Sequence, residues 1–505
     1  MFTSEVWIPH NCFDVGAFTV LTRKSYKLSI IELFGRFQQR RLGKMSKPKE
    51  YSSMTKDKLM TYTFVALVVI AIVTTVMWSQ ITVTHIDGSQ GWNLGLTVAL
   101  SALISVGVAV GIDAFLHKVA SDSPLNLMSA AVFGLIVTLS YSFGVPAMNT
   151  EAMLPVEAPG AFIFVALISA VGMVLFKKLQ GGKKLVNPAA AAKLLVFLPL
   201  SGAVFLAIDH LKTGLLGVPA LAGPLNLGTA PNFLSVGGNG AASFGTYLMS
   251  CFANPGVTTP ATSIDNLSSL MILTKFHGWA GGASSLAVII VGIALFALAR
   301  RYIKWRITLA YFVSVAVVSV LMSTLYGDTD LLTRLLFEVF IGSSIFMAFF
   351  MATDPASTPL THIGQIAFGI GLAVLTVLIQ TYMNFFGGSI LALIIMNLTS
   401  SKLDLLGKLK PTTESKEPKL PKGKAFAPEK IKEYQCMRCG ACMRVCCHKL
   451  SPIMIKQAFD KQDFDALNKL HADYCTACGH CTFVCPARID LRRSILQAKG
   501  ALRGQ

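Results

Sequence analysis

Apolar residues lie in long uninterrupted runs along most of the chain, not in the alternating or amphipathic patterns of soluble proteins. Ten of these runs are about 20 residues long, the length of an α-helix that crosses a hydrocarbon core about 30 Å thick. The expected spans are residues 59–78, 93–116, 125–146, 160–176, 188–208, 283–299, 306–326, 333–353, 363–382 and 387–405. The pattern therefore predicts a polytopic α-helical membrane protein with about ten transmembrane helices.

The composition agrees with this class. Of 505 residues, 53% are hydrophobic and only 14% are charged, and the mean hydropathy is +0.59. A soluble chain of this length needs more charged surface, and a disordered chain has fewer apolar residues, so both classes are excluded. The formal net charge is +18. In a membrane protein, such an excess of Lys and Arg is typical of cytoplasmic loops, so no nucleic-acid partner is expected.

The charges also predict the orientation of the chain. One set of loops carries most of the cations, namely Lys118, Lys177, Lys178, Lys183, Lys184, Arg300, Arg301, Lys304 and Arg306. The opposite set carries mainly acids, namely Asp87, Glu151, Glu157, Asp328 and Asp330. Loops rich in Lys and Arg remain in the cytoplasm, and the N-terminal segment is also basic. Both termini are therefore expected to be cytoplasmic.

Three segments lie outside the spans. Residues 1–58 are basic, and they fit either an amphipathic helix on anionic membrane lipid or a poorly ordered extension before a true start at Met45. Residues 406–426 are rich in Pro and Lys and have no apolar periodicity, which is typical of a linker. Residues 427–505 are expected to form a small separate domain.

Nine of the eleven cysteines lie between Cys436 and Cys485, and eight of them form two runs of C-x2-C-x2-C-x3-C. This is the spacing of bacterial ferredoxins with two [4Fe–4S] clusters, in which the fourth cysteine of one run binds the cluster of the other. Cluster 1 is therefore expected on Cys436, Cys439, Cys442 and Cys485, and cluster 2 on Cys475, Cys478, Cys481 and Cys446. Zinc is the alternative, but two complete runs of four cysteines favour iron–sulfur.

The cysteine-rich domain is expected to have a small α+β ferredoxin-like fold. Cys447 stands where the second run has Pro486, and it is one residue out of register, which predicts a free buried thiol. Basic residues surround the runs, namely Arg438, Arg444, Lys449, Arg488, Arg492 and Arg493. They suit an acidic electron donor such as a soluble ferredoxin; a merely solvated cytoplasmic surface is the alternative.

The longest loop, residues 209–282, joins the fifth and sixth spans and contains NPGVTTPATSIDN. Long loops in compact membrane proteins are usually functional. Small and hydroxylic residues let the backbone approach a planar ligand and supply donors to phosphate. The composition of this loop is a weak signal by itself.

Three stretches carry a resemblance to a known family: LVNPAAAAKLL from Leu185, GWAGGASSLAVIIVGIALF from Gly278 and FMATDPASTPLTHIGQIAFGIGLAVLTVLI from Phe350. Over residues 59–405 the chain resembles the D subunit of the Rnf electron-transport complex and the related B subunit of the sodium-pumping NADH:quinone reductase. The cysteine-rich end resembles the iron–sulfur part of the Rnf C subunit. The chain thus looks like a fusion of the two.

The resemblance implies an FMN attached through a phosphoester to a threonine on the extracytoplasmic side. The matching residue is Thr262, within Thr259-Pro260-Ala261-Thr262. The sequence departs from the family pattern at Pro260, where the family has Gly or Ser, and at Gly256, where it has an acidic residue. The family's glutamate in G-S-x-G-E is also absent from GGASS at 281–285. Non-covalent FMN and an ordinary Ser/Thr-rich loop are the alternatives.

Two charged residues, Lys193 and Glu338, fall within expected spans, where charge is costly and usually functional. Their expected depths differ by roughly 12 Å at 1.5 Å per residue, so they are not expected to pair. Simple contacts in the bundle interior are the alternative. Asn187-Pro188-Ala189 and Asp354-Pro355-Ala356 are expected to interrupt helices and to face the bundle interior.

These observations favour a membrane electron-transfer subunit that passes electrons from cytoplasmic clusters to an extracytoplasmic FMN in the cell membrane of a bacterium or archaeon. The resemblance implies partner membrane subunits, an extracytoplasmic FMN-binding protein and an ion-translocating complex. A second flavin in the bundle is left open. The alternatives from other classes are a transporter or channel with a regulatory iron–sulfur tail, and a membrane anchor for a ferredoxin domain.

Overall fold

The structure is a computed structural model of the whole chain. It describes residues 51–52, 54–79, 82–84, 90–119, 125–141, 143–146, 155–157, 161–178, 184–196, 279–326, 335, 338–340, 344–383, 388–406, 425–426 and 433–503. The expected N-terminal amphipathic segment before residue 51 and most of the linker lie outside these residues.

The chain divides into two compact units, which are described separately below. The membrane unit comprises residues 57–407 and 437–439. The cysteine unit comprises residues 1–56, 408–436 and 440–505.

Six helical segments described in the membrane unit are long and apolar enough to cross a membrane. They are α2 (Lys56–Trp78), α3 (Leu94–Val119), α5 (Ala161–Val171) with its continuation η1 (Gly172–Lys178), α11 (Trp305–Tyr326), α14 (His362–Met383) and α15 (Gly388–Leu406). Large apolar side chains on their outer faces are exposed, including Ile72, Leu103, Ile163 and Val317. In water such faces would be unfavourable, so they indicate contact with lipid. The polytopic α-helical class predicted from the sequence is confirmed.

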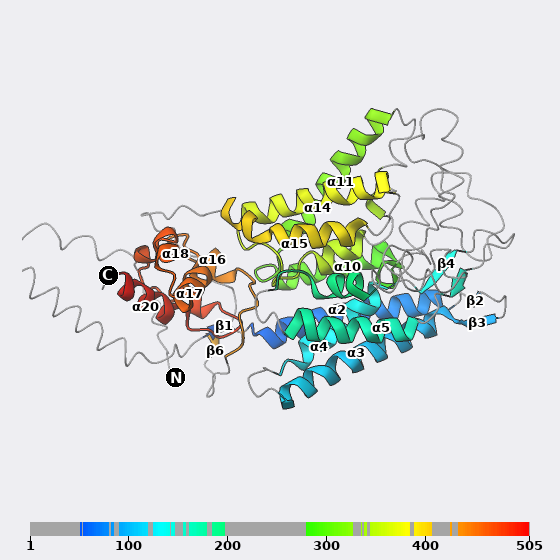
Figure 1. Cartoon of the computed structure of the whole chain (residues 1–505), viewed down its shortest axis with the longest axis horizontal. Coiled ribbons are helices and arrows are strands. Elements are labelled where there is room, and N and C mark those ends of the chain that lie inside the picture. Colours follow the sequence, from blue (N-terminus) through cyan, green and yellow to red (C-terminus); the bar gives the residue numbers. More distant parts are fainter. Residues whose placement is uncertain are drawn as a thin grey trace, which may run out of the picture. The chain divides into compact units, whose positions relative to one another are not determined.

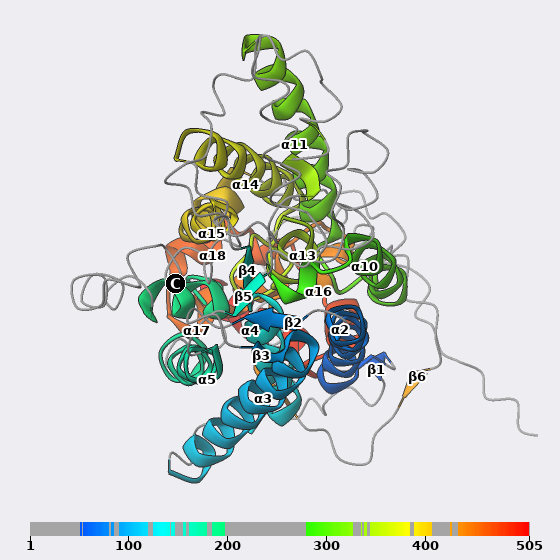
Figure 2. The same ribbon diagram turned by 90° about the vertical axis from the view of Figure 1, so that its right-hand side faces the viewer.

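The helices of the membrane unit pack in two groups (Figures 1 and 2). One group is α3, α5 and the shorter α4 (Leu127–Leu139), and the other is α11, α14 and α15. Glycines allow close contacts within each group. A Cβ on Gly134 of α4 would lie 2.8 Å from Val106 Cα, and one on Gly369 of α14 would lie 2.7 Å from the carbonyl of Ile307. Small residues of this kind let membrane helices approach closely.

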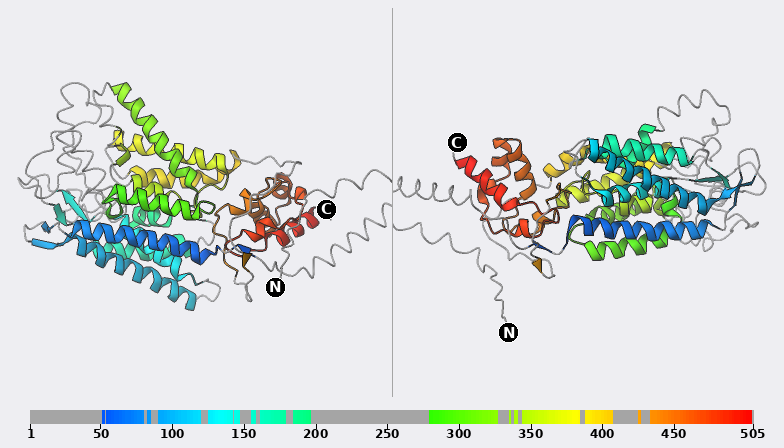
Figure 3. Two further views of the ribbon diagram at one scale, coloured as in Figure 1. Left: turned by 180° about the vertical axis from the view of Figure 1, so that it is seen from behind. Right: turned by 90° about the horizontal axis from the view of Figure 1, so that it is seen from below.

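Two loops meet in a small sheet at one end of the bundle, with strand order β3-β2-β5-β4. The strands β2 (Thr82–Thr84) and β3 (Gln90–Asn93) lie between α2 and α3, whereas β4 (Gly144–Pro146) and β5 (Pro155–Glu157) lie between α4 and α5. The parallel pairing of β2 with β5 joins the two loops. The β2–β3 strands and the strand that carries Glu157 therefore share one end of the bundle (Figure 3).

Two expected spans are shorter than predicted. α4 ends at Leu139, where the prediction continued to residue 146, and α10 (Ser285–Ala299) has 15 residues. At 1.5 Å per residue, helices of 13 and 15 residues measure about 20 and 23 Å, less than a hydrocarbon core of about 30 Å. Ser140, Gly144 and Pro146 follow α4, and residues of these types end helices readily. The expected spans 188–208 and 333–353 lie partly outside the described residues.

Two helical segments end in π-helical turns, and each is followed by a segment expected to interrupt the helices. η1 (Gly172–Lys178) precedes Asn187-Pro188-Ala189, and η6 (Met347–Met351), which follows α13 (Ser344–Phe346), precedes Asp354-Pro355-Ala356. Asn187 is buried; its Oδ1 accepts from Ala189 N, and its Nδ2 donates to the carbonyl of Met351 at 3.2 Å. The Asn187-Pro188-Ala189 segment therefore begins a new helix and contacts the end of η6, inside the bundle as expected.

The loop after η6 is held by two buried charged side chains. Lys304 Nζ donates to the carbonyl of Pro355 at 2.9 Å, and to the carbonyl and hydroxyl of Thr358 at 2.8 and 2.9 Å. Asp404 Oδ1 accepts from the backbone N–H groups of Leu360 and Thr361 at 2.6 and 3.1 Å. These bonds satisfy backbone groups that the irregular loop leaves without helical partners.

Replacing Lys304 should therefore destabilise the membrane unit. Lys304→Met removes three hydrogen bonds and leaves their buried acceptors unpaired, so the free energy of unfolding is expected to fall by about 2–4 kcal/mol. Thermal unfolding in nanodiscs measures the change. Lys402→Met, at an exposed position of α15, is the control and should change the midpoint little. Equal midpoints for the two variants would contradict this account of the loop.

The cysteine unit is built from short helices around its cysteine runs. These are α16 (Ala441–Arg444), α17 (Pro452–Asp460), α18 (Phe464–Lys469), η7 (Ala472–Tyr474), α19 (His480–Phe483) and α20 (Leu491–Arg503). The buried face of α20 carries Leu491, Ile495 and Ala498 and packs on α17. A two-residue antiparallel ladder joins β1 (Tyr51–Ser52) to β6 (Ala425–Phe426).

Candidate functional site

The two cysteine runs have the same backbone conformation. Each residue of the first run has a counterpart 39 positions later, as with Cys436 and Cys475 or Cys446 and Cys485. Left-handed residues recur at the same spacing: Arg438 (φ 54°) and Ala477 (φ 63°), Gly440 (φ 73°) and Gly479 (φ 82°), Lys449 (φ 53°) and Arg488 (φ 58°). Four of these six are not glycine, and left-handed backbone is unfavourable for such residues. Unfavourable backbone repeated at matched positions indicates a functional constraint.

Backbone hydrogen bonds repeat with the same offset. The N–H of Met443 donates to Gly440 at 3.2 Å, and the N–H of Thr482 donates to Gly479 at 3.0 Å. After the fourth cysteine of each run, Lys449 N donates to Cys446 O at 3.2 Å, and Arg488 N donates to Cys485 O at 3.1 Å. Each run therefore forms the same loop, followed by a single helical turn and a reversal.

The cysteines lie in a mostly dehydrated setting. Cys439, Cys442, Cys481 and Cys485 are buried, and the other four of the two runs are half-buried. Backbone N–H groups already point at sulfur, from Leu450 to Cys446 Sγ at 3.3 Å and from Ala477 to Cys475 Sγ at 3.4 Å. Burial raises the pKa of Cys446 to about 11, so this thiol is protonated at neutral pH without a metal. Metal binding must displace such protons.

The repeat of the two loops fits two equivalent metal centres. Two equivalent loops, each with three cysteines and a fourth further along, match the ligation of two [4Fe–4S] clusters.

Cys447 is buried, as the sequence predicts, but it also touches an expected ligand. Its sulfur lies 3.7 Å from Cys478 Sγ and 3.8 Å from Thr476 Oγ1. The spacing of the cysteines gives no sign of this contact, because it joins residues from different runs.

Arg488, which the sequence placed in the basic docking surface, is only 4% exposed and so contributes little to such a surface.

The membrane unit buries the two charged residues that the sequence singled out. Lys193 is 0% exposed and Glu338 is 1% exposed. Within the described residues no ion pair joins them. Lys193 Nζ instead donates to the carbonyl of Ser140 and lies 4.5 Å from the ring centroid of Trp279.

The sequence analysis missed two buried carboxylates within expected spans, Asp113 and the Asp404 described above. Asp113, near the end of α3, pairs with Lys178 at 2.5 Å and accepts from Asn126 N at 2.8 Å. It is buried, although it lies within an expected apolar span. The presence of a carboxylate within an expected apolar span was the sequence feature that could have identified it.

The expected flavin residue, Thr262, and the loop residues 209–278 lie outside the described residues.

Two family models match the chain. The model described as the NQR2, RnfD, RnfE family matches residues 45–411, and the 4Fe-4S dicluster domain matches residues 424–489. The second match agrees with the two repeated cysteine loops.

Individual relatives are similar over most of the first region. The chain is 26% identical to the D subunit of the Na(+)-translocating ferredoxin:NAD(+) oxidoreductase complex of Acetobacterium woodii, over 63% of this chain and 81% of that protein. It is 27% identical to the B subunit of the Na(+)-translocating NADH-quinone reductase of Pseudoalteromonas atlantica, over 62% and 73%. It is 25% identical to the D subunit of the ion-translocating oxidoreductase complex of Aliivibrio salmonicida, over 66% and 93%.

Proposed function

Because the chain belongs to the NQR2, RnfD, RnfE family, we propose that it is the electron-carrying membrane subunit of an ion-translocating redox complex. It takes electrons at its cysteine unit and delivers them to an FMN held at Thr262 on the opposite face of the membrane. Relatives are named as subunits of ferredoxin:NAD(+) and NADH-quinone oxidoreductases, which supports the redox class over a transporter with an iron–sulfur tail.

The observation that carries this proposal is the repeated cysteine loop on the same chain as the family's membrane unit. Cys436, Cys439, Cys442 and Cys485 would hold cluster 1, and Cys475, Cys478, Cys481 and Cys446 would hold cluster 2. Bound clusters supply one-electron transfer. The chain's own residues supply the thiolates, direct backbone N–H groups at sulfur and exclude water by burial.

Iron analysis tests the cysteine unit. Protein purified without oxygen should contain about eight irons per chain, and low-temperature EPR after dithionite reduction should show two interacting clusters. Heating with a chelator under air should remove the iron together with the EPR signal. Stoichiometric zinc in place of iron would overturn the assignment.

The flavin proposal rests on the family membership and on the Thr259–Thr262 motif. A tryptic peptide containing Thr262 should carry the mass of FMN less one water, because a phosphoester forms with loss of water. Fluorescence of the denatured chain in a gel should disappear in Thr262→Ala and persist in Thr259→Ala, the matched control. Covalent flavin retained in Thr262→Ala would move the attachment elsewhere.

The remaining parts of the proposal concern sidedness and partners. Both termini face the cytoplasm of a bacterial or archaeal cell, where a reduced soluble ferredoxin is the donor. Partner membrane subunits and an extracytoplasmic FMN-binding protein complete the path. Protease treatment of sealed inverted vesicles tests the sidedness, since it should remove the cysteine unit and leave the Thr262 peptide intact.

A further inference from the structure

Inside the bundle, the C-terminal end of the short helix α4 meets the turn that begins the short helix α10. α4 ends at Leu139, and the 3-10 turn η5 (Ala280–Gly282) leads into α10. The N–H of Ala280 donates to the carbonyl of Tyr141 at 2.9 Å, and the hydroxyl of Thr74 donates to the carbonyl of Ala280 at 2.7 Å. All three residues are buried, so the C-terminal end of α4 lies within the protein interior.

The end of α4 carries partial negative charge. The last carbonyls of an α-helix have no partner within the helix, and the aligned peptide dipoles place about half a negative charge there. The carbonyl of Ser140, the C-cap residue of α4, accepts a hydrogen bond from Lys193 Nζ. Lys193 comes from the helix over residues 188–196 and has no exposed surface.

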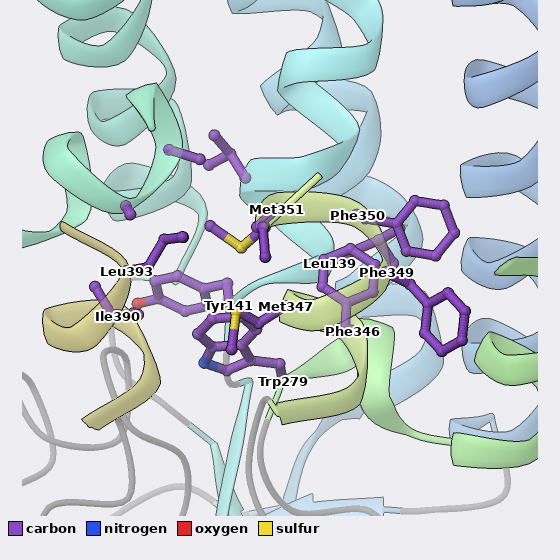
Figure 4. Packing of buried hydrophobic residues seen from close by; sticks show 14 of the residues in the cluster. Leu139, Tyr141, Trp279, Phe346, Met347, Phe349, Phe350, Met351, Ile390 and Leu393 are labelled. Atoms are coloured by element: carbon purple, nitrogen blue, oxygen red, sulfur yellow. The ribbon is translucent and has the colours of Figure 1, made fainter. Parts of the chain in front are cut away.

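The Lys193 ammonium also contacts the face of an aromatic ring, a second electron-rich group. Nζ lies 4.5 Å from the ring centroid of Trp279, within the range of an attractive cation–π contact. Trp279 is buried and meets the ring of Phe346 edge-on, with 6.4 Å between centroids. Trp279 and Tyr141 both belong to this buried hydrophobic centre (Figure 4). In the part of the chain that the structure describes, no carboxylate forms an ion pair with Lys193.

We propose that the C-terminal end of α4 and the face of Trp279 form a site for a monovalent cation, and that the ammonium of Lys193 is the cation that fills it. Carbonyls at the C-terminal ends of interrupted helices, and aromatic faces, are groups that attract alkali and ammonium ions in membrane proteins. A lysine ammonium is a compact point charge with three donors, so it suits such a site. Because the ammonium is tethered, its effective concentration is high, and free Na⁺ and K⁺ are excluded.

This inference does not depend on the proposed electron transfer, since neither the cysteines nor the Thr259–Thr262 motif enters it. Trp279 and Ala280 lie at the end of the 209–282 loop, outside that motif. It implies that an ion crossing the membrane with this subunit does not stop at the end of α4. The ammonium of Lys193 stabilises the junction of α4 with α10.

Chemical rescue tests the proposal. Lys193→Ala removes the side chain beyond Cβ, and n-propylammonium reproduces the missing atoms. The full chain in nanodiscs is unfolded thermally in n-propylammonium chloride, in NaCl and in N-methylglucamine chloride at equal ionic strength. The variant should have an unfolding midpoint several degrees below the wild type in N-methylglucamine. Saturable recovery is expected with n-propylammonium and with Na⁺, but not with uncharged n-propanol. The wild type should respond equally to all three salts.

Lys177→Ala is the matched control. Lys177 also donates to a carbonyl of α4, that of Ser129, and lies 5.2 Å from the ring centroid of Phe133, but it is only half-buried and far from the helix C-terminus. It should show no saturable recovery. The same low midpoint of Lys193→Ala in every salt, or equal recovery of Lys177→Ala, would overturn the proposal.

A second variant keeps the test decisive if Lys193→Ala does not fold. Lys193→Met retains the apolar stem and lacks only the charge. Burying a charge that has no favourable contacts is costly, so removing such a charge should stabilise the protein. The proposal requires the opposite result, a midpoint below that of the wild type. An unchanged or higher midpoint for Lys193→Met would refute it.

Discussion

Cys446→Ala should remove one whole cluster, about four of eight irons, whereas Cys447→Ala should leave both clusters in place. The two residues are adjacent and both are at least half-buried, yet only Cys446 has a counterpart 39 residues later in Cys485. In the proposed ligation Cys446 completes cluster 2, whose other ligands are Cys475, Cys478 and Cys481. The loss should therefore fall on cluster 2 and leave cluster 1 intact.

Iron content and EPR of reduced protein measure the difference. The coupled signal of two clusters should become the signal of one isolated cluster in Cys446→Ala, and should remain coupled in Cys447→Ala. Because Cys447 Sγ lies 3.7 Å from Cys478 Sγ, the double variant is a necessary control. If Cys446→Ala keeps about eight irons and Cys447→Ala loses four, Cys447 is the fourth ligand and the assignment of Cys446 is wrong; loss in the double variant alone means that either thiol can complete the cluster.

Periodic features of the chain could be predicted from the sequence because each depends on local spacing. The apolar runs of α2, α3, α11, α14 and α15 match or exceed the thickness of a hydrocarbon core, and their exposed faces carry the expected large apolar residues. The cysteine spacing likewise fixes which residues can share a cluster, and the repeated left-handed backbone is consistent with that interpretation.

Contacts between distant segments could not be predicted in this way. Hydropathy counts the residues of α4 and α10 as full spans, but it does not show that the helices stop short and meet at Tyr141 and Ala280. The environment of Lys193 needs Ser140 and Trp279, which lie 53 and 86 positions away in the sequence. Asp113 is satisfied by Lys178 and Asn126, and only the fold brings the three together.

Electron transfer from the cysteine unit to the Thr262 flavin should be slow in the isolated chain and fast when membrane partners are present. In the proposed orientation the two ends of the path lie on opposite faces of about 30 Å of hydrocarbon, much more than one fast electron transfer covers. A cluster of this chain's own cannot bridge the gap. A [4Fe–4S] cluster requires four thiolates, and the only cysteines outside the 436–485 region are Cys12 and Cys251.

The aromatic residues in the centre of the membrane unit do not carry electrons across this distance either. Trp279 and Tyr141 both belong to the buried core there (Figure 4), but indole and phenol side chains are oxidised only by much stronger oxidants than flavins or ferredoxins. An intermediate carrier must therefore be a second flavin within the bundle or a cofactor supplied by a partner protein. The relatives are subunits of larger complexes, which favours the partner.

Stopped-flow absorbance of the flavin separates these possibilities, with the full chain in nanodiscs and dithionite-reduced ferredoxin as the donor. Flavin reduction should be slow in the pure chain and should accelerate by orders of magnitude when partner membrane subunits are co-purified. Cys446→Ala, measured with the partners present, should abolish the fast phase if cluster 2 lies on the path. Reduction of the Thr262 flavin within milliseconds in the pure chain, with only two clusters and one flavin bound, would show that no intermediate carrier is needed.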